Sequence, residues 1–152
     1  MKIARDLGVV GRVRLAGRLD GESIVGLMNG ADVFALTSRR SPDGDIDGFG
    51  IAVVEAALCG TPAVVTSNSG LGEAIEAGIE VAEGAVAGVA AAVVQLLTDE
   101  VARRRMGEAA RGRAIRGQTW GHRAAQYDGL LRTVVEGGPL AAPLAESEAA
   151  EQ

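Results

Sequence analysis

The stretch from Asp43 to Glu55, DGDIDGFGIAVVE, gathers the residue types in this sequence that are best suited to chemistry. Three alternating aspartates followed by a glycine match the start of a calcium-binding EF-hand loop. That loop needs a bidentate glutamate at its twelfth position, where this sequence has Val54, and an entering helix, where this sequence has an apolar strand pattern. The alternatives are a divalent-ion Asp-x-Asp pair, Asp45 and Asp47, and a solvated acidic loop. Because the ligand spacing fails, we expect no metal cofactor.

A second interpretation uses Asp47 and Glu55 as acceptors for the hydroxyl groups of an organic ligand. Gly48 and Gly50 allow the backbone to approach a ligand closely, directly before the predicted helix Gly50–Cys59. Unpaired N–H groups and the dipole at a helix start favour an anion. The stretch thus suits a ligand with a phosphate and several hydroxyls. The alternative fits the spacing equally well: Asp47 only caps the helix and Glu55 faces solvent.

The elements that must position these residues alternate between short apolar runs and helical patterns, which predicts an α/β fold with a parallel sheet covered by helices on both faces. Apolar residues throughout the middle runs suit strands that are buried on both sides. The predicted strands are Val13–Gly17, Asp32–Leu36, Pro62–Thr66 and Ile79–Ala82, in sheet order as along the chain. The predicted helices are Gly21–Gly30, Gly50–Cys59, Gly72–Ala77, Ala85–Leu97, Asp99–Arg116 and Trp120–Val135.

Composition predicts one soluble domain at residues 1–136 and a disordered tail at residues 137–152. The 152 residues are 47% hydrophobic, enough for a sizeable core, whereas the tail is rich in Pro, Gly and acid. A net charge of −5 does not predict nucleic acid as a partner. The single cysteine, Cys59, excludes an internal disulfide, and the first residues lack the apolar run of a signal peptide. We therefore expect a cytoplasmic protein.

The stretch DGFGIAVVEAALCGTPAVVTSNSGLGEAIEAG resembles the donor-site signature of the group 1 (family four) retaining glycosyltransferases, which have the GT-B fold. Upstream, VRLAGRLDGESIVGLMNGADVFALTSRR is similar to the strand, acidic turn, helix and second strand of that family. Downstream, QTWGHRAAQYDGLL is similar to its tryptophan-containing closing helix. The resemblance covers roughly residues 2–136. It implies a Rossmann-like sheet that forms an incomplete C-terminal, nucleotide-sugar-binding half of a GT-B enzyme.

The resemblance also implies roles for individual residues. Glu55 would bind the ribose hydroxyls of the nucleotide, and Asp47 would contact hydroxyls of the donor sugar. The family generally needs no metal, retains the anomeric configuration, and stabilises charge on the leaving phosphate with donors and cations. Further contacts would come from backbone N–H groups near the sugar or pyrophosphate, and from residues beside the base: Gly48, Phe49 and Gly50, then Arg18, Leu19 and Ser38.

Two departures from the family pattern affect what we expect. Asp47 stands where the family usually has glutamate, which is one methylene longer. The sequence also lacks two family strands, their Gly-x-Gly turn and Arg/Lys pair, and the N-terminal acceptor domain. Because the two strands belong between Val13–Gly17 and Asp32–Leu36, those segments should pair directly, leave a gap, or borrow a partner's edge. We expect transfer only with the missing part in cis or trans; the alternative is a non-catalytic nucleotide-binding or interaction module encoded by a gene fragment.

Seven arginines gather between residues 103 and 123. A solvated helix face explains them better than RNA binding, because no aromatic residues interleave with them. Contact of the full-length enzyme with an anionic membrane surface stays open. The arginines are Arg103, Arg104, Arg105, Arg111, Arg113, Arg116 and Arg123.

Overall fold

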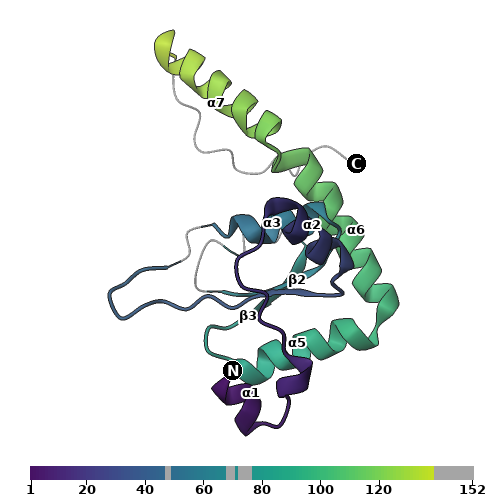
Figure 1. The fold of residues 1–152 in the computed structure, drawn as a ribbon. Helices are drawn as coiled ribbons and strands as arrows, with labels where there is room; N and C mark the ends of the chain where they lie inside the picture. The colour runs from purple at the N-terminus through teal and green to yellow at the C-terminus, as the bar shows by residue number, and fades with distance from the viewer. Residues whose placement is uncertain (47–48, 68–70, 72–76, 139–152) are drawn as a thin grey trace.

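The centre of the molecule is a parallel sheet of three strands, β1 (Phe34–Leu36), β2 (Ala63–Thr66) and β3 (Gly78–Val81). The computed structural model describes residues 1–46, 49–67, 71 and 77–138 (Figure 1). The sheet order β1-β2-β3 follows the chain, with Phe34 paired to Ala63 and Ala63 paired to Gly78. The predicted parallel sheet is therefore confirmed, with three strands in the described part of the chain.

Helices cover both faces of the sheet, as predicted. Every side chain of the central strand β2 is therefore buried. Ala63 and Val65 pack with Val53 and Val54 of helix α3 (Ile51–Leu58) on one face. Val64 points to the other face, where it packs with Ala92 and Leu96 of helix α5 (Val86–Thr98). The alternation is that of a central strand whose neighbouring residues point to opposite faces.

The remaining helices are α1 (Lys2–Asp6), the 3-10 turn η1 (Val10–Arg12), α2 (Gly21–Gly30), α6 (Glu100–Gly117) and α7 (Trp120–Val135). The bounds of α2 and α7 are those predicted, and α5 and α6 begin and end within one residue of the prediction. Side-chain caps favour these starting points in α2 and α6. Asp20 accepts a hydrogen bond from the Ser23 backbone N–H, and Asp99 accepts one from Ala102.

The strand predicted at residues 13–17 does not form. This segment has no regular secondary structure, and Val13 and Leu15 are exposed. Within the described residues β1 pairs with β2 alone, so direct pairing between the two segments does not occur. A run of apolar residues becomes a strand only where a neighbouring strand satisfies its N–H and C=O groups, and no strand of the described residues pairs with residues 13–17.

Helix α6 crosses the edge of the sheet at which the strands begin. Its Gly107 lies so close to the Gly60 carbonyl, in the turn before β2, that a side chain there would overlap with it. Ala110 and Ala114 pack against Ala57 of α3. Small residues thus allow α6 to approach the backbone closely at this edge.

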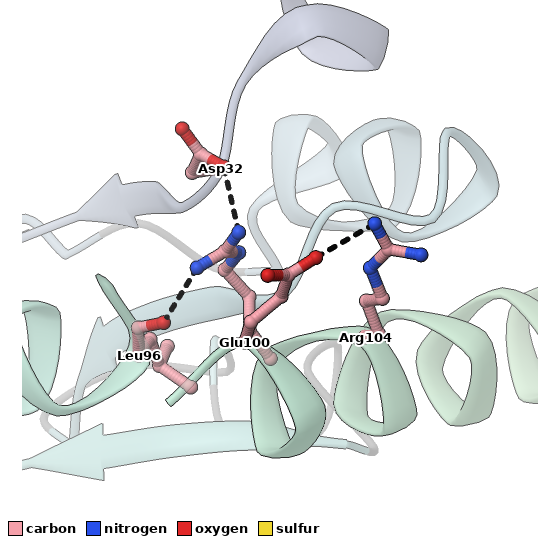
Figure 2. A network of polar contacts seen from close by, with 5 residues as sticks. Asp32, Leu96, Glu100 and Arg104 are labelled. Atoms are coloured by element: carbon pink, nitrogen blue, oxygen red, sulfur yellow. Dashed lines mark hydrogen bonds and ion pairs between the residues drawn. The ribbon is translucent and has the colours of Figure 1, made fainter. Parts of the chain in front are cut away.

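Two of the arginines of α6 also contact other elements, and of these two Arg103 is half-buried while Arg111 is exposed, as predicted. Arg103 donates to the Leu96 carbonyl at 3.1 Å and forms an ion pair with Asp32 at 3.1 Å, which joins α5 and the segment before β1 (Figure 2). Arg111 donates to the Leu58 carbonyl at 3.0 Å. Arg104 fits the predicted solvated face, since it is exposed and forms an ion pair with Glu100 one turn earlier (Figure 2).

Helix α7 projects away from the sheet beyond the end of α6 (Figure 1). It buries none of its residues, and Trp120 at its start is 87% exposed. Among the described residues, no helix is both long and apolar enough to span a membrane. The helix predicted at residues 72–77, except Ala77, and the tail predicted at residues 137–152, except its first two residues, lie outside the described residues.

Candidate functional site

The candidate site lies at the carboxyl edge of the sheet, where the strand ends and the start of α3 come together. Ser38 follows β1 and is half-buried, and its carbonyl accepts a hydrogen bond of 2.6 Å from the Thr66 hydroxyl at the end of β2. Thr66 is only 2% exposed, so this bond satisfies a polar group that would otherwise be buried without a partner. The end of β2 therefore fixes the backbone of Ser38.

The segment after Ser38 is held by a second contact. The Arg40 backbone N–H donates to the Glu83 carboxylate at 2.7 Å, and Glu83 lies in the turn between β3 and α5. Ser41 and Asp45 then close the segment: the Asp45 backbone N–H donates to the Ser41 hydroxyl at 3.1 Å. In return, the Ser41 backbone N–H donates to the Asp45 carbonyl at 2.9 Å.

Gly50 begins α3 in the left-handed region, with φ +71°. Only glycine adopts this conformation readily, and a side chain here would also overlap with the fully buried Leu71. Because Gly50 is the N-cap, no side chain of its own covers the first N–H groups of α3. The start of α3 therefore has the backbone conformation and the dipole that favour an anion.

Glu55 lies on the exposed side of α3, one turn after Ile51. The residues beside it, Val54 and Ala56, are buried. Helical side chains lean toward the N-terminus of their helix, so Glu55 leans toward the carboxyl edge of the sheet. Its carboxylate is thus available to a ligand that binds at the start of α3.

Leu19 is half-buried and precedes α2. The carbonyl of Met28, near the end of α2, accepts a hydrogen bond of 2.5 Å from the Thr61 hydroxyl, at the edge where the strands begin. Since α2 ends at that edge, its start lies toward the carboxyl edge of the sheet, and Leu19 comes directly before that start in the chain. The cap on α2 lowers the pKa of Asp20, because the Ser23 backbone N–H, and then its hydroxyl, stabilise the carboxylate.

The structure therefore brings Ser38, Gly50 and Glu55 to one edge of the sheet, with exposed Phe49 next to Gly50. Asp47 and Gly48 lie outside the described residues. The spacing between the two carboxylates, which the sequence interpretation uses, is for that reason still a prediction.

The acidic residues before α3 do not have the surroundings of an EF-hand. They follow strand β1 where an EF-hand has an entering helix. Within residues 1–46, 49–67, 71 and 77–138, no group of three or more His, Cys, Asp or Glu side chains is placed to hold a metal ion.

Sequence reasoning did not identify Thr66 and Glu83 as residues that shape this edge. Thr66 ends a predicted strand, where a polar residue in an apolar run is a weak signal. Glu83 contacts a backbone group 43 residues away in the chain, and no local pattern predicts such a pair.

Comparison with known proteins finds a family model and several relatives that match most of this chain. The family model described as Glycosyl transferases group 1 matches residues 1–113. The chain is 38% identical over 120 residues to a glycogen synthase of Mycobacterium tuberculosis, covering 77% of this chain and 28% of that protein. It is 33% identical over 134 residues to a GDP-mannose-dependent phosphatidylinositol monomannoside mannosyltransferase of Mycolicibacterium smegmatis, covering 86% of this chain and 35% of the relative.

Solved structures share the fold. Sucrose-phosphate synthase from Thermosynechococcus elongatus superposes with a TM-score of 0.78 at 25% identity, covering 90% of this chain and 34% of that one. HepE from Anabaena, in complex with UDP-glucose, superposes with a TM-score of 0.76 at 24% identity, covering 87% and 35%. The chain thus spans about a third of the length of these proteins.

Proposed function

Because this chain belongs to the group 1 glycosyl transferases, we propose that it is the donor-binding portion of a glycosyltransferase. The enzyme would transfer a sugar from a nucleotide-sugar donor to an acceptor, with retention of configuration. The observation that carries the proposal is the carboxyl edge of the sheet, where left-handed Gly50 opens α3 and Glu55 lies one turn further on. In open parallel sheets, ligands bind at this edge.

The proposed roles divide the donor among the site residues. Glu55 binds the ribose hydroxyls, and Asp47 contacts the hydroxyls of the sugar. Backbone groups of Gly48, Phe49 and Gly50 meet the sugar or the pyrophosphate. Ser38 and Leu19 lie beside the base.

The proposed chemistry needs no metal ion. Negative charge develops on the leaving diphosphate as the sugar departs, and fixed donors stabilise that charge without reorganising. The backbone N–H groups at the start of α3 are such donors, and the helix dipole adds partial positive charge there. Gly50 is the N-cap and has no side chain that could cover these groups.

We further propose that transfer requires the rest of the enzyme, in cis or in trans. The relatives are about three times as long as this chain, so we expect no sugar transfer by the 152 residues alone. A cytoplasmic location and peripheral membrane contact of the full-length enzyme belong to the same proposal. Its partners are the nucleotide sugar and the remainder of the enzyme, not nucleic acid.

Titration calorimetry on the full chain tests the division of roles. The probes are UDP with UDP-glucose, and GDP with GDP-mannose. Glu55→Ala should weaken binding of a diphosphate and of its sugar donor alike, by roughly 1–3 kcal/mol of binding free energy, because both ligands carry ribose. Asp47→Ala should leave the diphosphate nearly unchanged and weaken only the sugar-bearing donor.

Glu108→Ala is the matched control, since it removes an exposed glutamate from α6, away from the site. Equal effects of the Glu55 and Asp47 substitutions on both ligands would refute the division of roles. Diphosphate binding with no added affinity for any sugar donor would favour the alternative, a nucleotide-binding module without transfer activity.

A further inference from the structure

The segment between β1 and α3 is fastened to the other two strands of the sheet. The Thr66 hydroxyl, at the end of β2, holds the Ser38 carbonyl at 2.6 Å. The Glu83 carboxylate, after β3, holds the Arg40 N–H at 2.7 Å. A side chain at the end of β2 and one after β3 therefore hold the backbone of Ser38 and of Arg40, in the segment that comes after β1.

The two hydrogen bonds differ in burial and in the charge of the acceptor. Thr66 is a buried residue, and its bond to the half-buried Ser38 is partly shielded from solvent. The Glu83 bond is exposed, but it joins a charged acceptor to a backbone donor, and such bonds are about twice as strong as neutral ones. Glu83 is exposed and belongs to no core cluster of the described residues, so its removal should loosen the segment without disturbing the fold.

The segment that Glu83 holds carries charge suited to a phosphate. Arg39 and Arg40 are both exposed, and neither forms an ion pair within the part of the chain that the structure describes. Guanidinium groups bind phosphate oxygens well, because their planar set of donors matches the geometry of phosphate. A ligand that has to order this segment itself binds more weakly, because ordering costs conformational entropy.

We propose that Glu83 is a positioning residue of the donor site: through the Arg40 backbone N–H, it holds the Ser38–Arg40 backbone in the conformation that binds a nucleoside diphosphate. This rests on the proposed function, since it assumes that the carboxyl edge binds the nucleotide part of a donor. Glu83 does not touch the ligand. Its effect is on affinity for the diphosphate, whatever sugar is attached.

A test on the full chain combines amide hydrogen exchange with titration of UDP and GDP. Glu83→Ala should speed exchange at the Arg40 amide about five- to tenfold. The same substitution should lower the affinity for UDP or GDP, whichever binds to wild type, by about three- to tenfold. The thermal unfolding temperature should stay unchanged. Glu83→Gln keeps an acceptor oxygen and should lie between wild type and alanine in both measurements. Glu80→Ala, which removes an exposed glutamate of β3, should match wild type.

The variants separate positioning from charge. If the Glu83 charge acted only by repelling phosphate, both Glu83→Gln and Glu83→Ala would bind more tightly than wild type, and the proposal would be wrong. The proposal would also be wrong if wild type bound a diphosphate and Glu83→Ala bound it with the same affinity. Unchanged hydrogen exchange at the Arg40 amide would likewise contradict it. Failure of wild type to bind either diphosphate would instead reject the proposed function, and the role of Glu83 with it.

Discussion

Replacement of Gly50 by alanine should destabilise the chain more than any other single methyl addition at a left-handed glycine. The new Cβ would overlap with Cδ2 of Leu71 and would lie 3.3 Å from Cγ2 of Val53 and 3.5 Å from Cδ2 of Leu36. A left-handed alanine costs about 1–2 kcal/mol, and overpacking of a filled core costs about 1–3 kcal/mol. Leu71 is fully buried and cannot move aside into solvent, so we expect a loss of about 2–5 kcal/mol.

Urea unfolding followed by circular dichroism measures this loss, with Gly84→Ala as the matched control. Gly84 has φ +75°, almost that of Gly50, but no atom lies within 4 Å of its would-be Cβ. The control should lose only the conformational part, about 1–2 kcal/mol. If Gly50→Ala lost no more than Gly84→Ala, the close packing of Leu71 on the start of α3 would be refuted.

Two further predictions concern stability. Arg103→Ala should lower the free energy of unfolding in urea by about 1–2 kcal/mol, because it leaves the Leu96 carbonyl without its charged donor. Replacement of the exposed Arg104 by alanine should lower it by less than about 0.5 kcal/mol, and equal losses for the two variants would contradict the prediction. The hydrogen bonds from Ser23 lower the folded-state pKa of Asp20, so its contribution is present above its usual value of 3.8 and is lost as pH falls through the lower folded value. Between about pH 5 and pH 2.5, wild type should therefore lose more stability than Asp20→Ala, and parallel losses would reject this.

Local patterns predicted those elements whose ends are set by local contacts. Helix α7 begins at Trp120 because the preceding Thr119 accepts a hydrogen bond from the His122 N–H, a cap that the sequence shows directly. β2 was predictable as a strand buried on both faces, since all of its residues except Thr66 are apolar. The start of α3 was equally visible, because two glycines bracket Phe49.

Features that depend on distant partners were not predictable. Residues 13–17 have a strand-like composition, but a strand also needs a neighbour, which no local pattern specifies. Arg103 and Arg104 are adjacent in sequence and look alike, yet only Arg103 reaches the Leu96 carbonyl. Their difference follows from where α6 crosses the sheet edge, and this crossing depends on contacts such as that between Gly107 and Gly60.

The complete burial of β2 has a consequence for synthesis on the ribosome. The strands pair in the order in which they emerge, so β2 can join β1 and receive α3 as soon as both have left the ribosome. The opposite face, at Val64, is covered only by α5, which emerges after β3. Until α5 emerges, the nascent chain displays this apolar face of β2, and until β3 emerges the edge of β2 that β3 will join is also unpaired. Surfaces of this kind associate with other chains. The interval between the emergence of β2 and that of α5 is therefore the period in which this protein is most prone to aggregate.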